Sequence, residues 1–217
     1  MNIAPYIDHT LLKPDATAVD IQQLCAEAVA YHFAAVCIPP YYVQEAYHFL
    51  PQTDHRPLIA TVIGFPMGYS ATPAKVEEIK RAVDDGADEL DVVININAVK
   101  SKAWNYVRND LDSMITTAHM KGKKIKIILE TGLLDGPEID QLCDLALELK
   151  PDFLKTSTGF NGHGATPQAV QHLLSRVGPE ISIKASGGIR THEDARKYID
   201  LGVQRIGASR SIALVTA

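Results

Sequence analysis

Short apolar runs rich in β-branched residues alternate with longer amphipathic segments along the 217-residue chain. The short runs predict buried or half-buried strands, and the longer segments, with apolar positions three and four apart, predict helices. The predicted strands are Tyr6–Asp8, Ala34–Ile38, Leu58–Ile63, Glu89–Ile94, Lys124–Leu129, Asp152–Lys155, Ser182–Ala185 and Gln204–Ile206. The predicted helices are Ala18–Tyr31, Pro40–Leu50, Pro73–Asp85, Trp104–Lys121, Pro137–Leu149, Pro167–Arg176 and Thr191–Leu201.

Residues at the ends of these segments agree with the predicted helices. Thr17 followed by Asp20 is typical of a capping box. Proline suits the first turn of a helix and glycine suits the position after its end. The predicted helices have proline at their starts, as Pro73, Pro137 and Pro167, and glycine at their ends, as Gly86, Gly122 and Gly202.

Eight strand-plus-helix units in 217 residues give about 27 residues per unit, a normal period for a parallel sheet. Eight units indicate an α/β protein with a closed (β/α)₈ TIM barrel, and we expect residues 1–217 to form a single domain. A doubly wound open sheet is the alternative. It is disfavoured because the G-x-G-x-x-G pattern does not follow the first predicted strand.

Composition and charge limit the classes of binding partner and the cellular compartment that we expect for this protein. The net charge is −5 and the chain has no basic tract, which argues against nucleic acid as a partner. The longest apolar runs, such as Val92–Ile94, are too short to span a membrane, and the first residues do not resemble a secretory signal. Cys25, Cys37 and Cys143 lack the spacing of a disulfide framework, so we expect a reducing, cytoplasmic environment.

Two lysines lie in predicted strands that are neighbours in the barrel. Lys155 ends its strand after apolar residues, and desolvation there would favour a neutral amine, which can attack a carbonyl and form an imine. Lys184 sits similarly in the next strand, at a matching height, and each charge would disfavour the other. Either lysine alone could be an ordinary surface residue at a strand end. The spacing does not decide which of the two is the nucleophile.

Asp91 lies inside the apolar strand Glu89–Ile94 and therefore requires a partner. Lys155 and Lys184 are the candidates, and a carboxylate beside an amine could shuttle protons. A structural ion pair is the alternative for Asp91. Asp8, at the end of the first strand, either joins this group or acts as a turn residue.

Two glycine loops follow the last two predicted strands, at Ser186–Gly188 and Gly207–Ser209. Barrels often bind phosphate at these loops through backbone N–H groups, which glycine allows an anion to approach closely. Arg190 and Arg210 stand nearby and could add positive charge. The two loops together predict a phosphate site.

The histidines show neither H-x-H nor H-E-x-x-H spacing, so we expect neither a metal nor another cofactor. Further candidates to line the pocket are Asp8, Cys37, Glu130, Thr158 and Arg210. Cys37 could equally be a packed small residue, and Glu130 could instead support the pocket through a hydrogen bond. Lys126 is expected near the amino-terminal end of the barrel, away from the chemistry.

Four blocks of this sequence resemble those of the deoxyribose-phosphate aldolases, and they occur in the family's order. They are Ile7–Pro14, Leu90–Asn95, Lys155–Phe160 and Lys184–Arg190. The resemblance extends from about Ile7 to Ser211. It implies a class I aldolase without a metal or cofactor, which reversibly cleaves 2-deoxy-D-ribose 5-phosphate to D-glyceraldehyde 3-phosphate and acetaldehyde.

The resemblance also implies roles for individual residues. Lys155 corresponds to the Schiff-base lysine, Lys184 to the second lysine and Asp91 to the proton-relay aspartate. The residues implied in phosphate binding are Gly159, Gly187, Gly188, Gly207 and Ser209. A homodimer is the assembly that the resemblance suggests.

This sequence departs from the family at three places. Asn97 replaces a frequent glycine, Arg210 replaces a second small hydroxyl residue, and the chain ends at Ala217 without a longer tail. These departures bear on the preference for a sugar phosphate more than on the lyase chemistry. Two other functions stay open: a non-covalent sugar-phosphate isomerase, in which Lys155 and Lys184 only bind charge, and a non-catalytic barrel that binds phosphosugars.

Overall fold

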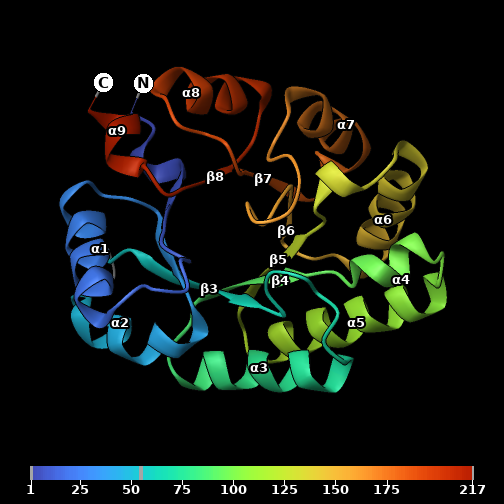
Figure 1. Cartoon of the computed structure of the whole chain (residues 1–217), viewed down its shortest axis with the longest axis horizontal. Coiled ribbons are helices and arrows are strands. Elements are labelled where there is room, and N and C mark those ends of the chain that lie inside the picture. The colour runs from blue at the N-terminus through green and yellow to red at the C-terminus, as the bar shows by residue number, and fades with distance from the viewer. Residues whose placement is uncertain (1, 54–55, 217) are drawn as a thin grey trace.

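The computed structural model describes residues 2–53 and 56–216. In it, eight parallel strands close into a barrel, in which each strand pairs with the next and β8 pairs with β1. The strands are β1 (Ile7–Thr10), β2 (Ala35–Ile38), β3 (Leu58–Ile63), β4 (Glu89–Val93), β5 (Lys124–Ile128), β6 (Phe153–Lys155), β7 (Ser182–Ser186) and β8 (Arg205–Ala208). Helices surround this ring (Figure 1). The predicted (β/α)₈ barrel is confirmed, and the open sheet is wrong.

Seven helices cover the outside of the barrel at the predicted places. They are α1 (Ala18–Ala30), α2 (Val43–Phe49), α3 (Thr72–Asp84), α5 (Trp104–Met120), α6 (Gly136–Leu149), α7 (Pro167–Val177) and α8 (His192–Leu201). Short elements that the sequence did not predict are α4 (Ile96–Lys100), α9 (Ser211–Val215) and the 3₁₀ turns η1 (Ala4–Tyr6), η2 (Pro40–Tyr42) and η3 (Thr131–Leu133). Elements of three to five residues are too short to show a helical period.

The helix ends follow the predicted signals. Thr17 and Asp20 form a full capping box at α1. Proline occupies the first turn of α3, α6 and α7. Gly202 ends α8 in the left-handed conformation, at φ 109°. These residues fix the starts of α1, α3, α6 and α7 and the end of α8.

Two predicted boundaries are wrong by a few residues. Tyr6 belongs to η1, so that β1 begins at Ile7 and continues to Thr10. Pro40–Tyr42 forms a 3₁₀ turn, and the predicted helix over Pro40–Leu50 is α-helical only from Val43. Proline at the start of each 3₁₀ turn lacks the N–H that would extend a strand or a regular helix backward.

The interior of the barrel is unusual because much of it is charged. Apolar side chains fill the layer between strands and helices. A second, small apolar cluster comes from β2 and β3, and consists of Ala35, Cys37, Ala60 and Val62. Buried charged side chains come from the other strands, and are Asp8, Glu89, Asp91, Lys126, Lys155, Lys184 and Arg205. These charged residues can persist without water only as mutual partners.

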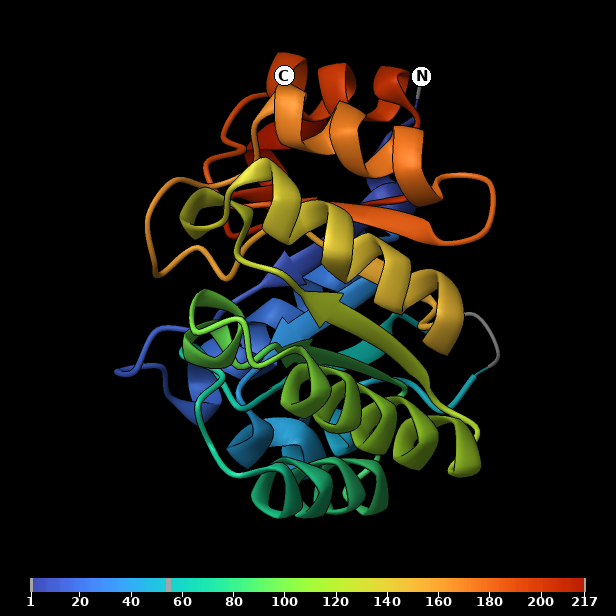
Figure 2. The ribbon, with the colours of Figure 1, turned by 90° about the vertical axis from the view of Figure 1, so that its right-hand side faces the viewer.

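The loops that follow the strands gather at one end of the barrel. In Figure 2, the blue loop after β1 and the orange loop after β6 project from the same side. Functional residues of such barrels lie at this carboxyl end of the strands. None of the helices described is long and apolar enough to cross a membrane. The assignment of residues 1–217 to one domain stays a prediction.

Candidate active site

Lys155 and Lys184 lie side by side on β6 and β7, where they are register partners. The side-chain nitrogens of both lysines contact the same carboxylate oxygen, Oδ2 of Asp91, at 2.8 Å from Lys155 and 2.7 Å from Lys184. Lys184 is fully buried, whereas Lys155 keeps 3% of its surface exposed. The structure thus brings together the three residues that the sequence singled out.

Asp8 extends this group to the first strand. Its carboxylate contacts the ammonium of Lys184 and also accepts a hydrogen bond from Arg205 at 2.6 Å. Burial alone would raise the pKa of Asp8, but Lys184 and Arg205 outweigh burial and hold this pKa well below its ordinary value. Asp8 is therefore a buried carboxylate with three cationic partners, Lys184, Arg205 and, at 4.0 Å, Lys126. Its alternative as a simple turn residue is wrong.

The charges of Asp91 and Lys184 reinforce each other. Burial would raise the pKa of Asp91, but the neighbouring positive charges, Lys126 first among them and Lys184 as well, lower it well below its ordinary value. Burial would likewise lower the pKa of Lys184, and the carboxylates of Asp8 and Asp91 raise it instead. Asp91 is therefore ionised and Lys184 is an ammonium ion near neutral pH.

Lys126 contradicts the expectation that it lies away from the chemistry. Its ammonium is 2.8 Å from Oδ1 of Asp91 and 2.6 Å from Glu89. Its backbone is one layer below Lys155, because Lys126 pairs with Phe153. A lysine side chain is long enough to cross that layer, and counting residues along the strand locates only the backbone.

Glu89 and Arg205 are two members of the cluster that sequence reasoning missed. The guanidinium of Arg205 donates to both oxygens of Glu89, at 3.0 and 3.1 Å, and links Glu89 to Asp8. Glu89 lies two residues before Asp91 on the same strand and therefore on the same face. That spacing was a usable signal for Glu89. Arg205 gives no such signal, since it opens a short strand.

Of the predicted phosphate residues, Gly159, Gly187, Gly188 and Ser209 lie on loops after β6, β7 and β8, whereas Gly207 lies within β8, which continues to Ala208. An added Cβ at Gly159 would be 4.0 Å from Cα of Gly187, at ordinary van der Waals contact. Gly207 lies above Lys184, where an added Cβ would be 3.2 Å from Cε of that lysine. Gly188 and Ser209 are exposed. The loops can therefore present backbone N–H groups near the mouth of the barrel, above the lysines.

The remaining candidates occupy different environments. Cys37 is buried in the small apolar cluster inside the barrel, and burial raises the pKa of its thiol. The backbone and hydroxyl of Thr158 both donate to the carboxylate of Glu130, so the two residues act together. Arg210 is exposed before α9 and, with Ser209, lines a surface hollow beside α1. Asn97 lies on α4.

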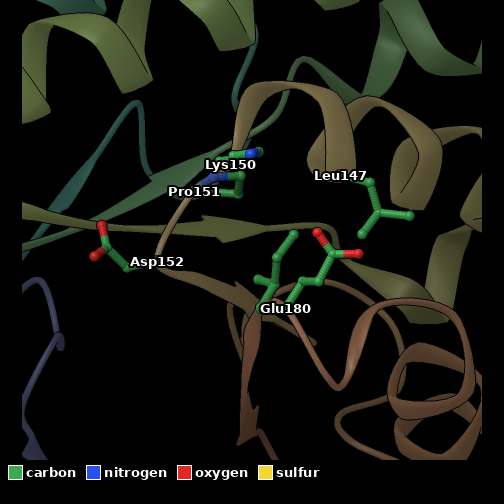
Figure 3. A pocket seen from close by; sticks show the side chains of 6 residues that line it. Leu147, Lys150, Pro151, Asp152 and Glu180 are labelled. Atoms are coloured by element: carbon green, nitrogen blue, oxygen red, sulfur yellow. The ribbon is translucent and has the colours of Figure 1, made fainter.

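Another hollow lies at the opposite end of the barrel. Leu147, Lys150, Pro151, Asp152 and Glu180 surround it, ahead of β6 and β7 (Figure 3). It contains none of the candidate residues. Within residues 2–53 and 56–216, His, Cys, Asp and Glu side chains nowhere gather in threes as they would around a metal ion. The prediction of a metal-free reaction stays untested by this geometry.

The fold and this cluster define a barrel enzyme with a buried amine–carboxylate centre at the carboxyl ends of its strands. The chain belongs to the DeoC/LacD family of aldolases, whose family model matches residues 3–214. It is therefore an aldolase, a lyase acting on carbon–carbon bonds.

Relatives of known name cover nearly the whole chain. The chain is 48% identical to deoxyribose-phosphate aldolase of Thermococcus gammatolerans over 215 residues, which is 99% of this chain and 96% of the relative. It is 46% identical to deoxyribose-phosphate aldolase of Clostridium novyi, over 99% of this chain and 96% of the relative.

Solved structures agree with the fold. A putative deoxyribose-phosphate aldolase from Coccidioides immitis superposes with a TM-score of 0.94 at 41% identity, covering 99% of this chain and 84% of the other. A tetrameric deoxyribose phosphate aldolase from Aeropyrum pernix gives a TM-score of 0.90 at 32% identity, covering 98% of this chain and 89% of the other.

Proposed function

We propose that this aldolase reversibly cleaves 2-deoxy-D-ribose 5-phosphate to D-glyceraldehyde 3-phosphate and acetaldehyde, through an imine on Lys155. The observation that carries the proposal is the shared contact of Lys155 and Lys184 with Asp91. The names of the relatives support the substrate, since all those described above are deoxyribose-phosphate aldolases.

The partners of the two lysines favour Lys155 as the nucleophile. Lys184 lies between two carboxylates, Asp8 and Asp91, which hold it in the charged form. Lys155 contacts only Asp91 among the residues described, and it retains access to the mouth of the barrel. An imine requires a neutral amine, so the lysine with fewer anionic partners suits the role better.

Charge balance within the cluster supports the same assignment. Ion pairs join three carboxylates, Asp8, Glu89 and Asp91, to four basic groups. The basic groups are Lys126, Lys155, Lys184 and Arg205. The basic groups outnumber the carboxylates by one. Lys155 has a single anionic partner among the residues described, whereas Lys126, Lys184 and Arg205 each have at least two.

The reaction can then be followed at named atoms. Nζ of Lys155 adds to the aldehyde carbon, C1, of the open-chain sugar, and loss of water leaves a protonated imine. The electron pair of the C2–C3 bond moves toward this imine, and the hydroxyl on C3 loses its proton. The products are D-glyceraldehyde 3-phosphate and an enamine on Lys155. Protonation of the enamine at C2 and hydrolysis release acetaldehyde and restore the amine.

Asp91 is placed to move the protons of these steps, because one of its oxygens contacts both lysines. The ammonium of Lys184 opposes a second positive charge on Lys155 and so favours the free amine. The phosphate would bind at Gly159, Gly187, Gly188, Gly207 and Ser209. Arg210 is exposed and lines the same surface hollow as Ser209, and it would add positive charge for the same anion.

Turnover of Lys155→Leu on 2-deoxyribose 5-phosphate tests the proposal. We expect no measurable cleavage and an unchanged circular dichroism spectrum, because leucine has a similar volume. Activity within about tenfold of the original, equivalent to about 1.4 kcal/mol in the barrier, would refute the nucleophile. An isomerase would convert the sugar phosphate without releasing acetaldehyde, and a binding protein would leave it unchanged. A cytoplasmic location and a homodimer stay predictions.

A further inference from the structure

Glu130 differs from the other residues of unusual backbone conformation. Four non-glycine residues described in the structure have positive φ. Three of them, His32, Lys102 and Lys150, are exposed, whereas Glu130, at φ 59°, is completely buried. A buried residue in this disfavoured region persists only when its surroundings hold it there. Glu130 lies just beyond β5, directly beside the strand that ends in Lys155.

The contacts of the Glu130 carboxylate all lie on the loop that follows Lys155. Its oxygens accept hydrogen bonds from the backbone N–H of Thr158, at 3.2 and 3.3 Å, and from the Thr158 hydroxyl. The side-chain amide of Asn161 donates to it at 3.4 Å. The side-chain nitrogen of Lys155 donates a hydrogen bond to Asp91 and not to Glu130. Glu130 is therefore connected to the active site only indirectly, through its hydrogen bonds to this loop.

Further contacts connect the residues held by Glu130 to other parts of the barrel mouth. The Thr158 hydroxyl accepts a hydrogen bond from Phe160 N–H at 3.0 Å. The Phe160 ring packs edge-on against Phe65, with centroids 5.2 Å apart. Asn161 also donates to the carbonyl of Pro66 at 3.2 Å. One carboxylate thus orders the loop after β6 and ties it to the loop after β3.

The other end of the loop is fixed against the loop after β7. The backbone N–H of Ala165 donates to the carbonyls of Ser186 and Gly187, at 3.0 and 3.1 Å. Gly164 lies so close to Gly187 that an added Cβ would be 2.2 Å from its carbonyl oxygen. Between these two anchors lies Gly159, one of the proposed phosphate-binding residues. Its position depends on both anchors, and Glu130 is the anchor next to Lys155.

We infer that Glu130 is a positioning residue, which holds residues 156–161 so that the backbone at Gly159 faces the phosphate of the substrate. This inference rests on the proposed function. It predicts that loss of the carboxylate weakens binding of a phosphorylated sugar more than it slows the chemistry at Lys155.

The variants Glu130→Ala and Glu130→Gln test this inference. Ala removes every acceptor, whereas Gln keeps the shape and one acceptor oxygen, and should therefore restore part of the effect. We expect Glu130→Ala to raise KM for 2-deoxyribose 5-phosphate on the order of tenfold, the size typical of lost hydrogen bonds to a charged group. KM for unphosphorylated 2-deoxyribose should change less than twofold. Glu148→Gln, at an exposed glutamate paired with Arg108, serves as the matched control.

Equal changes in KM on both sugars, or unchanged KM with reduced kcat in the Gln variant, would overturn the positioning role. Hydrogen–deuterium exchange separates this outcome from a failure of the proposed function. In Glu130→Gln, amides of residues 156–161 should exchange faster while those of β6 and β7 stay protected. If exchange of this loop is unchanged, Glu130 does not hold it, whatever reaction the enzyme catalyses. If exchange increases but the original protein does not cleave the phosphorylated sugar, the proposed function alone is wrong.

Discussion

Lys184 and Lys155 share one oxygen of Asp91, yet only Lys184 has a second carboxylate, Asp8, at its other side. This asymmetry separates two residues that look equivalent in the sequence. It gives Lys184 a fixed positive charge and leaves Lys155 as the amine that can be free. The predictions below follow from this difference and from the contacts around it.

Replacing Lys184 with leucine should nearly abolish turnover, by a factor on the order of 100 or more, although Lys155 remains. Asp8 and Asp91 would lose a cationic partner, and their negative charge would favour the protonated form of Lys155. The pH dependence of imine formation with acetaldehyde measures this effect. The profile should move to higher pH in Lys184→Leu. An unchanged profile would show that Lys184 does not control the charge of Lys155.

The glycine at position 188 should affect the phosphate more than the chemistry. Gly188 has a φ of 81°, which a valine cannot adopt without strain, so Gly188→Val should displace the loop after β7. We expect KM for 2-deoxyribose 5-phosphate to rise, with a smaller change for unphosphorylated 2-deoxyribose. Steady-state kinetics on the two sugars provide the comparison. Equal losses on both would mean that the loop shapes the barrel and does not bind the phosphate.

The buried pair of Lys75 and Asp110 joins α3 to α5 at 2.6 Å. Lys75 also donates to the carbonyls of Gly68 and Val93, at 3.2 and 3.3 Å, and is completely inaccessible to solvent. Lys75→Met would leave the buried carboxylate of Asp110 with the Thr72 hydroxyl as a hydrogen-bond donor but without its cationic partner. Loss of one partner of a buried ion pair typically costs about 3–5 kcal/mol in the free energy of unfolding. Urea denaturation measures this loss. The double variant Lys75→Met/Asp110→Leu should recover part of it, and a double variant as unstable as the single one would contradict the explanation.

Stability should decrease between neutral pH and about pH 5 because of His9. Burial lowers the pKa of His9 below its ordinary value, and the hydrogen bond that its ring donates to the Glu27 carboxylate, at 2.7 Å, opposes this shift only in part. A lowered pKa means that the unfolded chain binds the proton more readily. The stabilisation is therefore present above about pH 6.5, the ordinary pKa of histidine, and is lost as the pH falls below it.

The free energy of unfolding at pH 7.5 and at pH 5 checks the role of His9. In His9→Gln the difference between the two values should be smaller than in the original protein. His32→Gln, at an exposed histidine, should leave the difference unchanged. A decrease that is as large in His9→Gln as in the original would assign the pH dependence to other groups.

The sequence predicted where the site residues lie along the strands better than how far their side chains extend. Asp91, Lys155 and Lys184 were recognised as charged residues within or near the ends of apolar strands, where a charge requires a partner. Counting residues along β5 placed Lys126 too far from the centre, since it takes no account of a four-carbon side chain. Lys75 was missed because it lies within an otherwise polar, amphipathic helix, where a lysine normally indicates the solvent face. The pattern of hydrophobic and polar positions gave no indication of the left-handed backbone conformation at Glu130.

The central claim is that Lys155, and not Lys184, forms the imine. Borohydride reduction in the presence of acetaldehyde would convert such an imine to a stable ethyl amine, which peptide mass spectrometry can locate. We predict a single ethyl group on the peptide that contains Lys155, loss of activity in parallel with its formation, and no adduct in Lys155→Leu. An ethyl group on Lys184 would reverse the two roles, and the absence of any adduct in the active protein would contradict the imine itself.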